Sequence, residues 1–180
     1  GRSGSGKSTL IDIIAGLIDP DEGQIFYNND KEIHENISAW QSSLGYVSQD
    51  ALLLNDSIKN NICLGVDEDK IDYGKMENII DLIGMNKFYN DYNNNLDCKI
   101  GEGGSRISGG QKQRISIART LYFNPKIIIF DEATSSLDNE AEQQILDLIV
   151  KLKKDHMIII ISHNEKIKNI CDNFIDLDKK

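Results

Sequence analysis

The chain has 180 residues, with 29 acidic and 20 basic side chains, and 39% of its residues are hydrophobic. This length suits one domain with a substantial core, and the composition excludes disorder along the whole chain. The net charge of −9 argues against a nucleic-acid binder that works by bulk charge, so no nucleic-acid partner is expected. Three widely spaced cysteines without a Cys-x-x-Cys pair predict reduced side chains rather than a disulfide frame or a zinc site.

Residues 1–9 read GRSGSGKST, which contains the Gly-x-x-x-x-Gly-Lys-Ser pattern of a phosphate-binding loop. Such a loop normally follows a buried strand and opens a helix. The helix is indicated by one apolar stripe, formed by Leu10, Ile11, Ile14, Ala15 and Ile18. Because no strand precedes residue 1, we expect the chain to be a fragment that lacks its amino-terminal strands.

The rest of the sequence alternates predicted strands and helices. Strands are expected at Gln24–Asn28, Leu44–Gln49, Lys126–Asp131 and Met157–Ser162, with an edge strand at Phe174–Leu177. The third and fourth of these are apolar on both faces, as in a covered parallel sheet. A helix is predicted at Asn139–Lys154, capped by Asp138 or Asn139.

Between about residues 50 and 114 the pattern changes to helical segments broken by glycine and asparagine. We therefore predict an α/β core, built from residues 1–49 and 115–180, with an inserted helical subdomain. The parallel strands and the absence of a long linker favour a single domain.

The glycine-rich loop has a direct chemical interpretation. Its glycines let backbone N–H groups approach phosphate oxygens, and the helix that follows adds a partial positive charge. Lys7 is then placed to meet the β- and γ-phosphates, and the Ser8 hydroxyl to hold Mg²⁺. The alternative is an ordinary glycine-rich turn before a helix.

Asp131 and Glu132 end the apolar run KIIIFDE, at the edge where parallel sheets bind ligands. Asp131 could support Mg²⁺ through its water shell, and Glu132 could polarise an attacking water. A solvated acidic turn would explain this pattern equally well if it stood alone. Beside a phosphate-binding loop, the catalytic interpretation is favoured.

A second candidate anion site lies in ISGGQKQR, residues 107–114. Ser108 can cap the following helix, and Gly109 and Gly110 leave its first backbone N–H groups exposed to an anion. A plain helix cap would account for these residues too. It would not explain a second such helix start in one chain.

Together these motifs resemble the nucleotide-binding domain of an ATP-binding cassette (ABC) transporter. Six segments follow the family's order: the Walker A loop at 1–9, the Q-loop at Gln49, the signature at Ile107–Gln111, the Walker B strand at Ile127–Asp131 with Glu132, the D-loop at Ser135–Asp138, and the switch histidine His163. The resemblance covers essentially the whole chain and implies a P-loop NTPase (RecA-like) core. Ile107 replaces the usual leucine, a volume-preserving change that we expect to be harmless.

The resemblance also implies roles, because in this family two such domains pair head to tail and share each ATP. The residues expected to bind ATP within one chain are Arg2, Ser3, Gly4, Ser5, Gly6, Lys7, Ser8, Thr9, Gln49 and His163. The signature residues Ser108, Gly109, Gly110 and Gln111 would contact the partner's ATP, and the D-loop candidates are Ser136 and Asp138. Glu132, His163 and Lys7 are the catalytic candidates, and Ser8, Gln49 and Asp131 the ligands expected for Mg²⁺. Taken alone, a histidine such as His163 is more often structural.

Two segments resemble the exporter branch of the family. Residues 45–65 follow the exporter pattern after Gln49, and Ile100–Gly104 resembles the exporter X-loop before the signature, although a flexible turn would look similar. The resemblance implies an ATPase on the cytoplasmic side of a membrane, with a second nucleotide-binding domain and a transmembrane domain as partners. Export or flipping of a lipid, a lipid-linked glycan or a peptide is expected by analogy.

The alternatives are an ABC importer subunit and a non-transport ATPase of the DNA-repair or chromosome-maintenance class. The latter class carries long coiled coils between its motifs, and no heptad repeat occurs here. A catalytically inactive regulatory domain would be expected to lack Lys7, Glu132 or His163, and all three are present.

Overall fold

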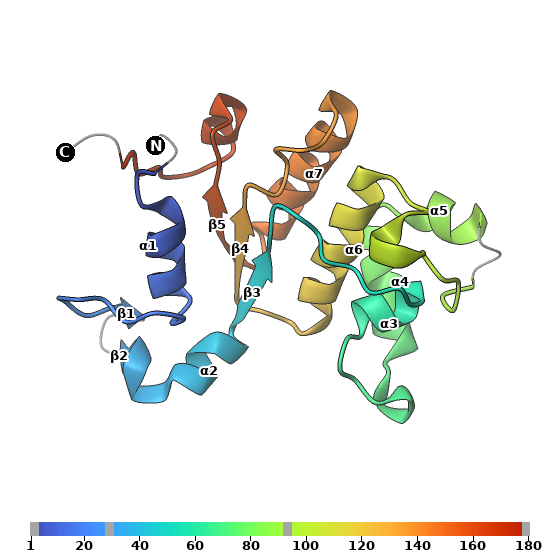
Figure 1. Ribbon diagram of the computed structural model, residues 1–180, viewed down its shortest axis with the longest axis horizontal. Helices are drawn as coiled ribbons and strands as arrows, with labels where there is room; N and C mark the ends of the chain where they lie inside the picture. Colours follow the sequence, from blue (N-terminus) through green and yellow to red (C-terminus); the bar gives the residue numbers. More distant parts are fainter. Residues whose placement is uncertain (1–3, 28–30, 92–94, 178–180) are drawn as a thin grey trace.

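The computed structural model describes residues 4–27, 31–91 and 95–177. Its helices and strands follow one another along the chain (Figure 1). They are α1 (Lys7–Ile14), β1 (Phe26–Tyr27), β2 (Lys31–Glu32), α2 (Ile37–Ser42), β3 (Leu44–Val47), α3 (Ile58–Ile62), α4 (Tyr73–Leu82), α5 (Asn86–Asp91), α6 (Gly109–Tyr122), β4 (Ile127–Asp131), α7 (Asn139–Leu152) and β5 (Met157–Ile161). Short 3₁₀ turns include η3 (Glu102–Gly104) and η4 (Glu165–Asn169).

The central sheet has the order β3-β4-β5, and all three strands are parallel. Residues of β4 alternate between two apolar clusters, because successive side chains point to opposite faces. Ile129 packs with Ile11 of α1, whereas Ile128 and Phe130 pack in the cluster that contains α6 and α7. Figure 1 shows α1 on one side of the sheet and α6 and α7 on the other. The predicted covered parallel sheet in an α/β fold is confirmed.

Two segments differ from the sequence prediction. The edge strand expected at Phe174–Leu177 is wrong: no described strand pairs with it, and Phe174 and Ile175 are 67% and 82% exposed. The stripe of the first helix is also shorter than expected. α1 ends at Ile14, and Ile18 lies in the exposed turn that follows.

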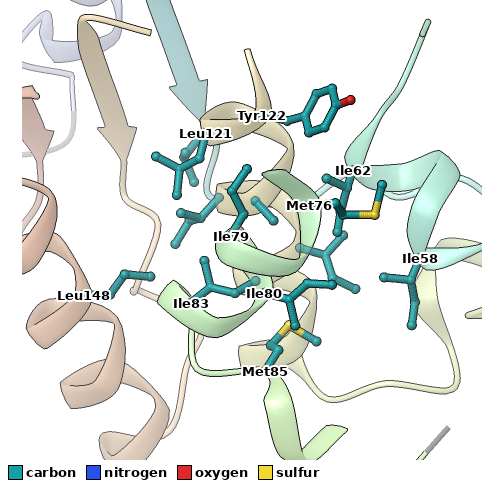
Figure 2. Packing of buried hydrophobic residues seen from close by; sticks show 14 of the residues in the cluster. Ile58, Ile62, Met76, Ile79, Ile80, Ile83, Met85, Leu121, Tyr122 and Leu148 are labelled. Atoms are coloured by element: carbon teal, nitrogen blue, oxygen red, sulfur yellow. The ribbon is translucent and has the colours of Figure 1, made fainter. Parts of the chain in front are cut away.

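The helices between β3 and β4 pack around their own part of the core (Figure 2). Ile58 and Ile62 of α3, Met76 and Ile80 of α4, and Leu121 of α6 are buried in one cluster of apolar side chains, which Figure 2 draws as sticks. α6 spans residues 109–122 and so runs across position 114, where we placed the end of the helical subdomain. The division at residues 49 and 114 stays a prediction.

A partly buried guanidinium joins α6 to α3 and to the segment before it. Arg119 Nε donates to the carbonyl of Asn61 at 2.7 Å, and its Nη1 donates to the carbonyl of Leu52 at 2.9 Å. Asn61 is fully buried, and its side chain in turn bonds both the N–H and the carbonyl of Leu54. Burial lowers the pKa of Arg119 from its ordinary value. These bonds satisfy backbone groups that helices and strands leave unpaired in this segment.

None of the helices in the described ranges combines the length and the apolar character that a bilayer crossing requires.

Candidate functional site

The sheet brings three predicted site segments to one edge. Because β3, β4 and β5 are parallel and in register, their carboxyl ends lie together, and the amino-terminal end of α1 lies at the same end of the sheet (Figure 1). Gln49 follows β3 and is exposed, Asp131 and Glu132 end and follow β4, and His163 follows β5. This edge is where open α/β sheets bind ligands.

Glu132 and His163 are in direct contact. His163 Nε2 lies 2.8 Å from Glu132 Oε1, and the two side chains are 49% and 24% exposed. Glu132 has a φ of 48°, a left-handed conformation that is uncommon for a residue with a side chain. Its N–H donates to the carbonyl of Ile161 at 3.0 Å, and its carbonyl accepts from the N–H and hydroxyl of Ser135. Such strain persists where the surrounding structure fixes the residue, as it often does at functional sites.

A cleft of about 250 Å³ opens in front of this pair. The residues that line it are Gly4, Gly6, Lys7, Ser8, Thr9, Glu132 and His163. The structure therefore places the glycine-rich loop and all three catalytic candidates, Lys7, Glu132 and His163, around one cavity. That these residues bind ATP stays a prediction, and Arg2 and Ser3 lie outside the described residues.

The loop geometry suits an anionic ligand. Gly4 and Gly6 have φ values of 82° and 88°, which only glycine adopts without strain. No side chain from the described part of the chain caps the start of α1. The hydroxyl of Ser5 is buried and finds no hydrogen-bond partner among the described residues. An orphaned buried hydroxyl beside uncapped N–H groups fits a phosphate that completes these bonds.

Oxygen atoms dominate the candidate ligands for Mg²⁺. Tyr46 donates its hydroxyl to Asp131 Oδ2 at 2.6 Å, and burial together with this carboxylate raises the pKa of Tyr46 well above its ordinary value. No three His, Cys, Asp or Glu side chains gather into a metal cluster within the described residues. Ser8, Gln49 and Asp131 each carry a side-chain oxygen of the kind that Mg²⁺ prefers, and that they bind the ion stays a prediction.

The second candidate anion site lies at the start of α6, and none of its residues is among those that line the cleft. Ser108 Oγ accepts from the Gln111 N–H at 3.2 Å, and Gln111 Oε1 accepts from the Ser108 N–H at 2.8 Å. This reciprocal pair is a capping box, so Ser108 caps α6 as its position predicts. A Cβ on Gly110 would lie 3.1 Å from Ala141 Cβ, so the helix start abuts α7.

The predicted D-loop residues lie at the start of α7. Asp138 caps that helix by accepting from the Ala141 N–H at 2.8 Å, whereas Ser136 is exposed. Neither residue is among those that line the cleft, and Leu137 between them packs against Gly109 at the start of α6.

Sequence reasoning missed the tyrosine that bonds the Walker B carboxylate. Tyr46 and Asp131 are 85 residues apart in the chain. A tyrosine near the end of the strand before Gln49 was a usable signal for a polar contact at this edge. Its partner becomes visible only once β3 and β4 pair.

Comparison with known proteins identifies what the chain resembles. The family model described as ABC transporter matches residues 1–135. An export ATP-binding/permease protein of Rickettsia typhi is 41% identical over 99% of this chain and 31% of its own length. The ATP-dependent lipid A-core flippase of Aliivibrio fischeri is 36% identical over the same shares, and the ATP-dependent permease MDL1 of Candida albicans is 40% identical over 94% of this chain and 25% of its own.

Among solved structures, a bacterial Atm1-family ABC exporter with ATP bound matches with a TM-score of 0.80. It is 35% identical, and the match covers 96% of this chain and 29% of that one. The chain thus spans about a third or less of the length of the relatives it matches.

Proposed function

The chain belongs to the ABC transporter family, and from this premise we propose that it binds ATP with Mg²⁺, hydrolyses it and thereby drives export. The family expected from the sequence motifs is confirmed. The exporter type is supported by the matched relatives, which include an export permease, a flippase and an Atm1-family exporter. These relatives favour export over the importer and DNA-maintenance alternatives.

The contact between Glu132 and His163 is the observation that carries the proposal. A carboxylate and an imidazole 2.8 Å apart, across a cleft from Lys7, form the arrangement needed to orient a water for in-line attack on a γ-phosphate. Glu132 accepts the proton of that water, and His163 contacts the γ-phosphate while holding the carboxylate in place. Buried apolar residues behind β4 keep this edge of the sheet rigid.

Lys7 and the loop N–H groups bind the triphosphate and stabilise the charge that develops on it. The Mg²⁺ ligands we propose are Ser8, Gln49 and Asp131, and the ion when bound neutralises charge on the β- and γ-phosphates. Tyr46 orients the Asp131 carboxylate toward this role. The remaining residues proposed to contact ATP are Arg2, Ser3, Gly4, Ser5, Gly6 and Thr9.

We propose that two copies of the domain, or this domain and a similar one, share each ATP. Ser108, Gly109, Gly110 and Gln111 would then contact the nucleotide of the opposite subunit, which agrees with their position outside this chain's cleft. Ser136 and Asp138 would lie at the same interface. The relatives' names combine ATP binding with a permease, and we infer a transmembrane domain as the further partner.

The proposed location is the cytoplasmic side of a membrane, where an exporter takes its ATP. The proposed cargo is a lipid, a lipid-linked glycan or a peptide. Similarity to a lipid A-core flippase supports the first of these classes.

Glu132→Gln tests the proposed chemistry. The amide has almost the same shape but cannot take a proton, so ATPase turnover of the full-length protein should fall by about 10²–10⁴-fold. ATP affinity, measured in parallel by equilibrium binding, should stay close to wild type. Glu140→Gln, an exposed glutamate on α7, is the matched control. Hydrolysis at the wild-type rate by Glu132→Gln would remove this residue from its role.

A further inference from the structure

Glu142 is a buried carboxylate next to the site, and the chemistry described above does not use it. It lies on α7, one turn after Asp138, and is 9% exposed. Its Oε2 accepts from Lys166 Nζ at 3.1 Å, and its Oε1 accepts from Asn164 Nδ2. Both oxygens are therefore bonded to the turn that begins at His163.

Asn164 organises that turn with each of its polar groups. Its N–H donates to Ser162 Oγ at 2.9 Å, and its Oδ1 accepts from the Lys166 N–H at 2.9 Å, which caps η4. The side-chain NH₂ group that remains is the one bonded to Glu142. The residue directly after His163 is thus fixed by bonds on both sides of the turn and anchored to α7.

His163 itself has no comparable anchor on this side, because it is half exposed and its described contact is with Glu132. On the other side, the Glu132 N–H holds the carbonyl of Ile161 at the end of β5. The direction of the imidazole therefore depends on the turn that follows it. The cost of burying the Glu142 carboxylate is offset by its bonds to Lys166 and Asn164, so the carboxylate links α7 to this turn.

We propose that Glu142 is a positioning residue for His163: through Asn164 and Lys166 it fixes the turn that aims the imidazole at Glu132 and at the γ-phosphate. This inference rests on the proposed ATPase function and adds to it a residue outside the six family motifs. Glu142 touches neither ATP nor water in this proposal, so its effect should fall on turnover rather than on nucleotide binding.

The test uses the full-length protein with ATP and Mg²⁺, and measures kcat and KM separately. Because a displacement of about 1 Å at a catalytic group can cost about a hundredfold in rate, Glu142→Ala should lower kcat by about 10- to 100-fold while KM for ATP changes less than about twofold. Glu142→Gln still accepts from Asn164 and should keep at least about half of the wild-type kcat. Asp147→Ala, an exposed carboxylate on the same helix, is the matched control.

Asn164→Ala removes the same link from the half-exposed turn, and it tests the proposal if Glu142→Ala does not fold. It should lower kcat to a similar extent. In a His163→Ala background, Glu142→Ala should cause no further loss of turnover, whereas a residue that acts only on stability would still reduce it.

Three outcomes would overturn the proposal. If Glu142→Ala or Asn164→Ala matches Asp147→Ala, or if the loss persists undiminished without His163, Glu142 does not act through His163. If the wild-type protein itself shows no ATPase activity that Glu132→Gln removes, the proposed function fails and the inference falls with it. An active wild type therefore separates the two failures.

Discussion

The amino-terminal ends of α1 and α6 are both rich in glycine, yet they are built differently. At α1 no described side chain caps the helix, the preceding glycines have positive φ values, and Ser5 keeps a buried hydroxyl without a described partner. At α6 the capping box of Ser108 and Gln111 already satisfies two backbone N–H groups. The start of α1 has no side-chain cap among the described residues, whereas the start of α6 has one.

This difference suggests separate roles for the two helix starts: one holds a nucleotide, and the other contacts a nucleotide that another subunit holds. An uncapped helix start gains most when a phosphate completes its bonds, so α1 is suited to hold the nucleotide of its own chain. A capped start is stable by itself and can present its glycines to a nucleotide held elsewhere. Three experiments test this difference between the starts of α1 and α6.

Lys7→Ala should have the largest effect. We propose that Lys7 makes charge-assisted hydrogen bonds to the phosphates of bound ATP before the reaction begins. One such bond is worth about 1.5–3 kcal/mol, so its loss should lower ATP affinity by about 10- to 150-fold. Equilibrium binding of ATP to the full-length protein measures this. Lys87→Ala changes an exposed lysine at the start of α5 and should leave affinity unaltered. Unchanged affinity in Lys7→Ala would contradict our interpretation of the uncapped start of α1.

Co-expression of Lys7→Ala with Ser108→Arg tests whether the two helix starts serve different ATP molecules. Each variant alone damages both sites of a dimer, but a mixed dimer gathers both lesions in one site. Random pairing makes about half the dimers mixed, so roughly a quarter of the wild-type sites should reappear. ATPase activity of the co-expressed protein, compared with each variant alone, gives the first measurement.

Tagged mixed dimers provide the control, because two intact sites could be required for turnover. They should contain one site that binds ATP with wild-type affinity, because one Lys7 and the opposite Ser108 are both intact, even if they do not hydrolyse it. If no site binds ATP more tightly than the sites of the two parent variants do, the shared site is contradicted.

Ser5→Ala and Ser108→Ala should give the smallest changes, with opposite signs. Ser108→Ala removes a helix cap and should lower the free energy of unfolding by about 1 kcal/mol without nucleotide. Ser5→Ala removes a buried hydroxyl that has no described partner, so it should leave stability unchanged or raise it by up to about 1 kcal/mol. Urea unfolding of the full-length protein in the absence of ATP compares the two, and equal losses would show that the helix starts do not differ as described.

The sequence predicted the parts of this molecule that depend on local pattern. The buried runs before Asp131 and His163 became β4 and β5, and Ser108 and Asp138 cap the helices that follow them. The edge strand predicted at Phe174–Leu177 did not form, because alternation of apolar and polar residues does not by itself supply a neighbouring strand to pair with.

Contacts between distant segments were not predictable from one sequence. The bonds from Tyr46 to Asp131 and from Glu142 to Asn164 join residues that become neighbours only after the sheet and α7 have formed. The family resemblance named His163 and Glu132 as catalytic candidates, but it did not predict that they touch. These residues carry no local signal that distinguishes a catalytic histidine from a structural one.

The bonds made by Arg119 tie the position of α6 to that of the segment between Leu52 and Asn61. The helix has 14 residues, with Gly109 and Gly110 at one end and Arg119 about 15 Å along it at 1.5 Å per residue. A tilt of about 10° at the glycine end would move Arg119 by about 2–3 Å at that rise per residue. Hydrogen bonds of 2.7 and 2.9 Å to the carbonyls of Asn61 and Leu52 cannot stretch that far. A tilt of that size would therefore either break these bonds or move the segment that carries Asn61 and the exposed Leu52 together with α6.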